Sequence, residues 1–544
     1  MPFRRTCVLF LFCLAFIGVA PCQQTGSTAV ISQGSSTAST QAEQPAQEQP
    51  SLADIARKVR KDKPADVRLT EAEGKELFKS VDKVFDFASE DTGFAKRSTV
   101  KKAVVGQADI EKFTKNRLAR AEYSQRFARS ELTMKKFGLL PRDFDLKEFL
   151  VKANGQSIAG LYDEETKTIW LLNTVSFDKQ GPILAHELTH ALQDQNYDLG
   201  RWAKAGEKPA GKAKAGDDDN GVVDESTTAR HAIVEGQAMV VYIDYLLAPF
   251  GRNLKDTPGV VASMEDTAVS ATIDTELMHK APMVLREAGS FPYREGLFFE
   301  ADIVGKRGKQ AAFQGVFAQP PRNTHEIFDS NAYLERAKLT PVVIPDVRPL
   351  LSNDYEVFDS GSFGELDVRA LLKQFGDKHG ATDFAPAWQG GAYIAFKRTQ
   401  ATAGAQPTTA DVALLYVSHW KNTQAAEHFA RFYATTVAKR YKNASVQPVP
   451  ACATAPCPVG AALVSTEEGP VIVEEWPDNT VIVSESFDSA TAAKLSSAVR
   501  TRPRDQHASA SQEELSLRLH SLAAFRAFQA RIGEQILRGI ISGR

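Results

Sequence analysis

A chain of 544 residues is longer than one ordinary domain, so we expect two or three domains. Its 65 Lys and Arg residues nearly balance its 67 Asp and Glu residues, which excludes the strong basic excess typical of nucleic-acid-binding proteins. The hydrophobic fraction of 43% is ordinary for a folded globular protein. We therefore expect no nucleic-acid partner.

Residues 1–22 have the pattern of a secretory signal peptide. Two arginines precede an apolar run from Cys7 to Ala20, and the run ends just before Cys22. This run is shorter than the ~20 residues that a membrane-spanning helix needs. We predict cleavage near Cys22 and export to the periplasm or the extracellular space. Association of the exported protein with the cell envelope is an alternative location. An uncleaved signal and lipidation of Cys22 are open alternatives.

Export changes how the cysteines are interpreted. The chain has five cysteines, and the three before residue 23 leave with the signal peptide. The remaining two, Cys452 and Cys457, are close together in sequence. In an oxidising compartment, they are expected to form a local disulfide.

The chain up to residue 350 is predicted to contain a tether and then a metal-binding domain. Residues 23–50 are rich in Gln, Ser, Thr and Ala with few large apolar residues, which is typical of a disordered segment. Residues 51–350 form the predicted domain, with its metal core at about 150–330. Residues 51–148 are expected to be helical, because apolar residues recur at helical spacing from Leu77 to Phe87 and from Ile110 to Phe137.

The pattern changes to a β-hairpin at residues 157–173. Aromatic and β-branched residues lie on both sides of a polar turn at Asp163–Thr166. A short loop through Gly181 and Pro182 is then expected to lead into a helix. A strand edge beside a metal-binding helix can bind a peptide through main-chain pairing.

That helix carries the motif His186-Glu187-Leu188-Thr189-His190. Residues four apart lie on the same face of a helix, so His186 and His190 can direct their imidazoles at one metal ion. Glu187 beside them is placed to act as a general base. The motif predicts a site for one Zn²⁺ ion in a peptidase.

A catalytic zinc site usually has three protein ligands and one open position, so a third ligand is expected downstream. A second helix is predicted from about Ser226 to Leu247, and Glu235 on it is our first candidate. Gly236 and Ala238 are small, which would let this helix pack closely against the first one. The alternatives are His231, one turn earlier on the same face, and then Asp224 and Glu225.

These residues resemble the gluzincin class of zinc metallopeptidases, whose familiar member is thermolysin. The matching segments are His186–His190 and Glu235-Gly236-Gln237-Ala238. More narrowly, the chain is similar to a group of exported bacterial HExxH proteins over about residues 150–350. Three further segments carry that similarity: Gly160–Asp163, Phe291–Phe298 and Gln319–Ile327. The resemblance implies zinc at His186, His190 and Glu235 with Glu187 as general base, and it does not supply a substrate. Our own expectation from the peptidase interpretation is a peptide or protein substrate.

The resemblance also implies a histidine or tyrosine that stabilises the oxyanion. We prefer His325, which lies in a turn that contains Pro320, Pro321 and Asn323. The other candidates are Tyr293, His279 and Tyr242. Asp194, one turn after His190, is a candidate to orient a ligand. Three hypotheses stay open: a peptidase, a non-catalytic zinc-binding scaffold or envelope-associated binding protein on the same fold, and a vestigial motif.

The rest of the chain is predicted to form a smaller α+β domain at 351–505. Strands are expected at Gly391–Lys397, Asp411–Val417 and within Val471–Val483, and an amphipathic helix at Thr423–Tyr441. Residues 506–544 form a predicted terminal amphipathic helix, which packs on the body or makes peripheral contact with a membrane. The overall fold class is α+β, with a mostly helical metal domain.

Overall fold

The structure is a computed structural model that describes residues 69–501. The gaps within that range are 119–120, 158–159, 165, 174, 176, 206–222, 264–275, 339–341, 352, 400–406 and 453–455. The predicted signal peptide, the tether and the C-terminal amphipathic helix lie outside the described residues. The described chain mixes helices with two sheets, which confirms the α+β class.

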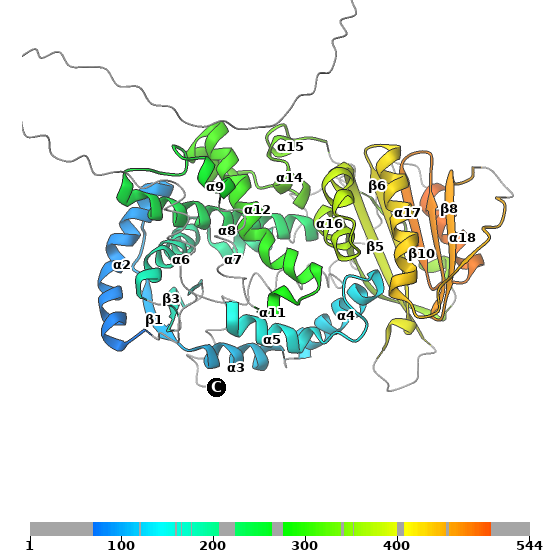
Figure 1. Cartoon of the computed structure of the whole chain (residues 1–544), viewed down its shortest axis with the longest axis horizontal. Coiled ribbons are helices and arrows are strands. Elements are labelled where there is room, and N and C mark those ends of the chain that lie inside the picture. Colours follow the sequence, from blue (N-terminus) through cyan, green and yellow to red (C-terminus); the bar gives the residue numbers. More distant parts are fainter. Residues whose placement is uncertain are drawn as a thin grey trace, which may run out of the picture. The chain divides into compact units, whose positions relative to one another are not determined.

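Long helices surround the HExxH motif (Figure 1). The motif lies in α6 (Phe177–Tyr197), which packs against α2 (Glu71–Thr92) and α8 (Val223–Leu247), and α8 packs in turn against α12 (Met283–Arg307). Part of α8 is long and apolar enough to cross a membrane, but most of it is buried among its neighbours. The other helices before residue 350 are α3 (Gln107–Leu118), α4 (Ala121–Phe137), α5 (Leu146–Ser157), α7 (Leu199–Ala205), α9 (Gly259–Ser263), α11 (Glu276–His279), α13 (Val316–Ala318), α14 (Thr324–Phe328) and α15 (Ser330–Leu334), with 3₁₀ turns at η1 (Ala248–Phe250) and η3 (Arg348–Leu350) and a π-helical turn at η2 (Ala311–Gly315).

A three-stranded sheet lies beside α6. It has the order β1 (Lys101–Val105), β3 (Thr168–Leu172), β2 (Gly160–Asp163), with β1 parallel and β2 antiparallel to β3. The hairpin of β2 and β3 confirms the sequence-based prediction. The strand β1 contradicts the sequence-based prediction, because residues 51–148 were expected to be helical. Five residues are too few to show a period against their surroundings, and pairing with the distant β3 decides their conformation.

The α6 helix begins earlier than its sequence indicates. Pro182 was expected in the first turn, yet the helix begins at Phe177 and includes the proline. Pro182 removes the hydrogen bond to the carbonyl group of Asp178 and its ring crowds that group, so the interruption is confined to the start of the helix. Gln180 also anchors this turn, because its Nε2 donates to the carbonyl oxygens of Leu172 (3.1 Å) and Val175 (3.0 Å).

Gly236 of α8 packs against α12. A Cβ atom on Gly236 would overlap the carbonyl group of Gly296 and lie 2.9 Å from its Cα atom. The expectation that Gly236 lets α8 approach the HExxH helix is therefore wrong about its partner. Sequence spacing shows which residues share a helix face, but it cannot show which neighbour that face meets.

A second sheet follows residue 350. Its strands are antiparallel in the order β4 (Tyr355–Ser362), β5 (Trp388–Arg398), β6 (Val412–Trp420), β10 (Thr480–Glu485), β9 (Gly469–Glu475), β8 (Gly460–Thr466), β7 (Ser445–Gln447). In Figure 1, α17 (Thr423–Arg440) lies along these strands. The remaining elements are α16 (Glu365–Gln374), α18 (Ser489–Thr501), the π-helical turn η4 (Gly380–Phe384) and the 3₁₀ turns η5 (Ala385–Ala387) and η6 (Thr409–Asp411).

Both faces of this sheet are buried. Along β6, Leu414 and Tyr416 point into one core, while Ala413 and Leu415 point into another core that includes Leu495 of α18. Alternate residues of a strand face opposite sides, so a strand covered on both sides is apolar throughout. The predicted strands and the helix at 423–441 agree with these elements. The first of these cores also contains Phe137 of α4, so it extends across residue 350.

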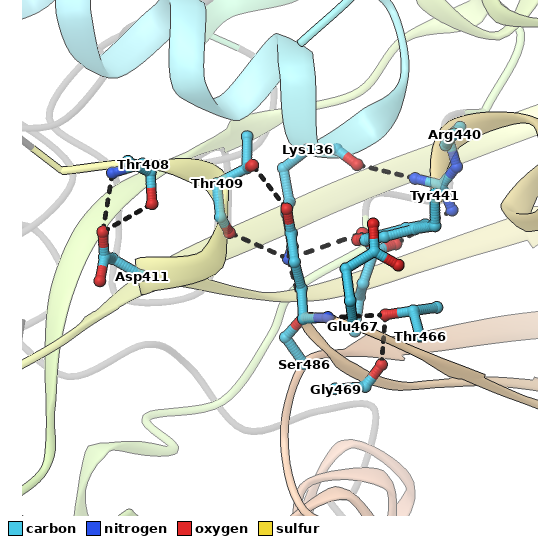
Figure 2. A network of polar contacts seen from close by, with 12 residues as sticks. Lys136, Thr408, Thr409, Asp411, Arg440, Tyr441, Thr466, Glu467, Gly469 and Ser486 are labelled. Atoms are coloured by element: carbon cyan, nitrogen blue, oxygen red, sulfur yellow. Dashed lines mark hydrogen bonds and ion pairs between the residues drawn. The ribbon is translucent and has the colours of Figure 1, made fainter. Parts of the chain in front are cut away.

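A buried polar network fixes α4 to the second sheet. Lys136 donates to the Thr409 carbonyl oxygen (3.1 Å), a Glu468 carboxylate oxygen (2.9 Å) and the Ser486 hydroxyl (2.7 Å). Arg440 at the end of α17 donates to the Lys136 carbonyl oxygen (2.7 Å). Figure 2 shows Lys136 entering this network from α4. The network joins elements that are more than 250 residues apart in sequence.

Candidate metal centre

Three side chains from two helices converge beside β2. The helix α6 supplies His186 and His190, and α8 supplies Glu235. The two histidine Nε2 atoms are 3.0 Å apart. Glu235 Oε2 lies 3.2 Å from the Nε2 of His186 and 3.4 Å from that of His190. All three residues are buried, and together they form a group that could hold a metal ion.

The spacing of these donor atoms fits a single tetrahedral ion. Bonds of about 2.0–2.1 Å to one ion place two tetrahedral donors roughly 3.3 Å apart. The three observed separations lie between 3.0 and 3.4 Å. Two imidazole nitrogens and one carboxylate oxygen also match the ligand types that such sites use. The donor set therefore fits a metal ion without rearrangement of the helices.

The electrostatics of the group favour a cation. Burial raises the pKa of Glu235, but the charge of His190 and hydrogen bonds from His186 and His190 outweigh burial and lower it well below its usual value. Burial lowers the pKa of His190, and the Glu235 carboxylate outweighs burial and raises it to about 9. A buried carboxylate thus retains its charge because positive charge lies next to it. A bound metal cation can take the place of that proton.

Glu187 lies between the motif helix and β2. The backbone N–H of Tyr162 donates a hydrogen bond to its carboxylate. A Cβ atom on Gly160 would lie 3.1 Å from Glu187 Oε1, so only glycine gives the strand this close approach. Burial raises the pKa of Glu187, while His186 and His190 oppose that shift. A raised pKa brings a carboxyl group closer to the range in which it can exchange protons.

The alternative third ligands lie outside the converging group. His231 Nε2 lies 3.3 Å from Glu235 Oε1, whereas the two motif histidines approach Oε2. Glu225 instead accepts hydrogen bonds from the backbone N–H (3.0 Å) and hydroxyl (2.6 Å) of Thr324. The Asp224 side chain is not among those described. The geometry thus selects Glu235, with His231 against its second oxygen.

The residue that orients a histidine is Gln193, which the sequence analysis missed. Its Oε1 atom lies 2.9 Å from His190 Nδ1. Asp194, the expected orienting residue, instead accepts from the Tyr162 hydroxyl (2.8 Å) and from Lys167. The signal was available, because residues three apart also share a helix face and Gln193 follows His190 by three.

The candidates for an oxyanion donor occupy different places. The ring of Tyr293 lies 6.3 Å from that of His186 at an angle of 27°, and its hydroxyl is hydrogen-bonded to Glu235. His325 Nδ1 instead lies 2.6 Å from Glu365 Oε2 on α16. The others, His279 on α11 and Tyr242 on α8, are exposed and partly buried, respectively. Among the described contacts of these residues, those of Tyr293 reach the converging group.

The two cysteines retained in the predicted mature chain form a disulfide. Cys452 and Cys457 are joined, with their Cα atoms 5.9 Å apart, in the segment between β7 and β8. The pairing is the one predicted from the cysteine count.

Comparisons with family models, with curated proteins and with solved structures found no match to this chain. The site must therefore be interpreted from its own geometry.

Proposed function

We propose that this protein is an exported zinc-dependent metallopeptidase of the gluzincin type. The observation that carries the proposal is the set of donor separations between His186, His190 and Glu235, which fits one tetrahedral ion. A His₂Glu ligand set is the one that thermolysin-like peptidases use for zinc. Glu187, next to the first ligand on the same helix, supports hydrolysis over simple metal storage.

Bound zinc would supply a Lewis acid for the scissile carbonyl group and would lower the pKa of a water molecule. Glu187 takes the proton from the attacking water and passes it to the leaving amine. Its hydrogen bond from the Tyr162 N–H and its contact with Gly160 fix the carboxylate beside the ligands. In this proposal, the base and the three ligands act on the same carbonyl carbon.

The donor to the oxyanion in this proposal is Tyr293, and no longer His325. Burial raises the pKa of Tyr293 well above its usual value, and the charges of Glu235 and Glu187 raise it further, so the hydroxyl retains its proton. A protonated hydroxyl beside the ligand group can donate a hydrogen bond to developing negative charge. Replacing Tyr293 with Phe should lower kcat by about 10²-fold with little change in metal content.

The substrate in this proposal is an extended peptide. β2 is an edge strand of its sheet, because β3 is its neighbour on one side in the order β1, β3, β2. Gly160 and Leu161 at its start are partly exposed, and Glu187 lies against Gly160. An edge strand can pair with the main chain of a peptide and so present a bond to the base.

The test starts with metal content. The purified chain should contain one zinc ion, and His186→Ala should contain much less. Wild type should then cleave members of a mixed peptide library, whereas Glu187→Gln should retain zinc and lose cleavage. Wild-type protein without stoichiometric zinc would contradict the zinc site. Equal and negligible cleavage by wild type and Glu187→Gln would leave a zinc-binding scaffold as the function.

Export is a separate part of the proposal. It rests on the sequence of residues 1–22, and N-terminal sequencing of protein from the periplasm or the culture medium tests it. A mature chain that begins close to residue 23 agrees with the proposal. A chain that retains residues 1–22 in the cytoplasm contradicts it.

A further inference from the structure

The hairpin of β2 and β3 contacts the motif helix α6 at two places. The first is Glu187, because the Tyr162 N–H donates to its carboxylate and a Cβ atom on Gly160 would lie 3.1 Å from its Oε1. The second is Asp194, whose Oδ2 accepts from the Tyr162 hydroxyl at 2.8 Å. Tyr162 therefore contacts α6 with its backbone at one place and with its side chain at the other.

The two contacts lie along one side of α6. Asp194 follows Glu187 by seven residues, which is close to two helical turns. Both side chains thus have nearly the same direction from the helix axis, and they are separated by about 10 Å along it. One strand that lies along this side of the helix can reach both of them. The position of Tyr162 relative to Glu187 is therefore linked to its contact with Asp194.

Asp194 is a buried acceptor with three donors. Its Oδ2 also accepts from the Lys167 ammonium group, and its Oδ1 accepts from the Leu199 N–H at 3.3 Å. Its side chain is buried, and hydrogen bonds to a charged group are stronger than those between neutral groups. Burial raises the pKa of Tyr162, and the charge of Asp194 raises it further, so the hydroxyl retains its proton and donates.

The place of β2 in its sheet makes this contact important. The strand has four residues and pairs with β3, and the sheet order β1, β3, β2 gives it no second neighbouring strand. Few main-chain hydrogen bonds hold such a strand, so it opens more easily than a central one. Its position against α6 then depends on what its side chains contact.

We infer that Asp194 is a positioning residue for the proposed base. Through the Tyr162 hydroxyl and the Lys167 ammonium group, it holds β2 where the strand fixes the Glu187 carboxylate. Sequence spacing suggested that Asp194 orients a metal ligand, whereas its contacts lead to the base instead. The inference rests on the proposed function for the role of Glu187. The hold on β2 does not depend on that role.

The first experiment measures this hold without activity. Backbone hydrogen exchange of the full chain, followed by mass spectrometry, reports on residues 160–163. Tyr162→Phe removes the hydroxyl and keeps the ring, and Asp194→Ala removes the acceptor. Exchange in residues 160–163 should become about tenfold faster or more in both variants. Exchange at the wild-type rate in both variants overturns the inference.

The matched control is Tyr333→Phe. Tyr333 is buried like Tyr162, and its hydroxyl donates to the Gln319 carbonyl oxygen at 2.9 Å. The variant also loses one hydroxyl hydrogen bond, but this bond lies outside the hairpin. Exchange in residues 160–163 should stay at the wild-type rate. Equally faster exchange in Tyr333→Phe and Tyr162→Phe would show general loosening and overturn a specific hold.

The second experiment separates positioning of the base from loss of the peptide-binding edge. Tyr162→Phe should lower kcat about tenfold, because a small displacement of a catalytic group slows the chemical step. KM should stay within about threefold, because Gly160 and Leu161 remain paired with β3, and zinc content should stay at the wild-type level. A raised KM with an unchanged kcat overturns the role towards the base.

A double variant tests whether the two residues act through one contact. Tyr162→Phe combined with Asp194→Ala should lower kcat no further than Asp194→Ala does alone, because the second change removes a hydroxyl that no longer has its acceptor. Losses that multiply in the double variant overturn the shared contact.

The outcomes also separate this inference from the proposed function. Wild type that cleaves no peptide overturns the proposed function and the positioning role with it, while hydrogen exchange still decides the hold on β2. Wild type that cleaves peptides no faster than Tyr162→Phe and Asp194→Ala overturns the positioning role alone. If these two variants do not fold, Lys167→Met decides the matter, because the Lys167 side chain is about half exposed. Exchange in residues 160–163 at the wild-type rate in Lys167→Met then overturns the inference.

Discussion

Gly236 of α8 and Gly296 of α12 are in direct backbone contact. A Cβ atom on Gly296 would lie 3.2 Å from the Cα atom of Gly236 and would overlap the carbonyl group of Ala232. The two helices can approach this closely only because neither residue has a side chain. Glu235, the proposed third ligand, is the neighbour of one of these glycines, so the helix contact also fixes the position of the ligand.

Replacing Gly236 with Ala should therefore force α8 and α12 apart. We expect the free energy of unfolding to fall by about 1–3 kcal/mol, because an added methyl group has no space in a closely packed contact. Zinc affinity should fall as well, because Glu235 moves with its helix. Urea unfolding and a chelator competition measure the two effects.

The matched control for this variant is Gly305→Ala. Gly305 is an exposed glycine of α12, the helix that Gly236 contacts, and nothing lies within 4 Å of its added Cβ atom. This variant should raise the free energy of unfolding by about 0.5–1 kcal/mol, because alanine favours a helix over glycine. Equal stability changes in the two variants would contradict the packing argument.

Replacing Gly160 with Ala should separate the base from the ligands. The added Cβ atom would lie 2.7 Å from Ile183 Cγ2 and 3.1 Å from Glu187 Oε1, so the Glu187 carboxylate must shift. We expect peptide hydrolysis to fall by on the order of 10²-fold, because a displacement near 1 Å at a catalytic group has that effect. Zinc content should stay at the wild-type level, since no ligand is touched.

Kinetics and metal analysis of the same preparation test this prediction. Gly259→Ala is the control, because nothing lies within 4 Å of its added Cβ atom. A Gly160→Ala variant that loses zinc together with turnover would show a collapse of the site and not a displaced base.

Asp91 should make stability depend on pH. Lys309 bridges Asp91 and Asp244, with 2.7 Å from Lys309 Nζ to Asp244 Oδ2. Burial raises the pKa of Asp91 to about 7, the Asp244 carboxylate raises it too, and Lys309 opposes both. The folded-state pKa thus lies above the pKa of about 3.9 that aspartate has in an unfolded chain. The contribution of Asp91 to the free energy of unfolding is complete below the pKa that this group has in the unfolded chain. That contribution is lost as the pH rises through about 7.

The variant Asp91→Asn removes this titration. Between about pH 4.5 and 7.5, wild type should lose on the order of 1–3 kcal/mol of unfolding free energy relative to the variant. Urea unfolding at several pH values measures the difference. Asp86→Asn on the same helix is the control and should leave the slope unchanged, because Asp86 is mostly exposed. A wild-type protein that gains stability relative to Asp91→Asn over this range would reverse the sign and refute the argument.

Lys136 should be essential for the contact between α4 and the second sheet. Its ammonium group has no exposed surface and contacts Glu468 at 2.9 Å, with Glu485 at 3.9 Å. Lys136→Met removes the buried cation that these two carboxylates share and leaves Glu468 with Arg142 and Glu485 with Arg440, which should lower the unfolding free energy by about 3–5 kcal/mol. Urea unfolding measures this loss. Lys79→Met removes an ion pair with Glu76 that is mostly exposed, and no measurable change is expected.

The sequence by itself determined the parts of this protein that depend on local spacing. Residues 186, 187 and 190 share one region of a helix because of the helical period, and the hairpin before them alternates with the period of a strand. The α+β class and most strands after residue 350 follow from the same periods. The disulfide followed from counting the cysteines that remain after the predicted cleavage.

Only the tertiary structure decided which distant residues meet. Glu235 rather than Glu225 reaches the histidines, Tyr293 rather than His325 lies against them, and Gln193 rather than Asp194 orients a ligand. The pairing of β1 with β3 and the contact of Gly236 with α12 were likewise absent from any local pattern. A period states which side chains share a face, whereas the partner of that face depends on how the helices and strands pack, which local spacing does not specify.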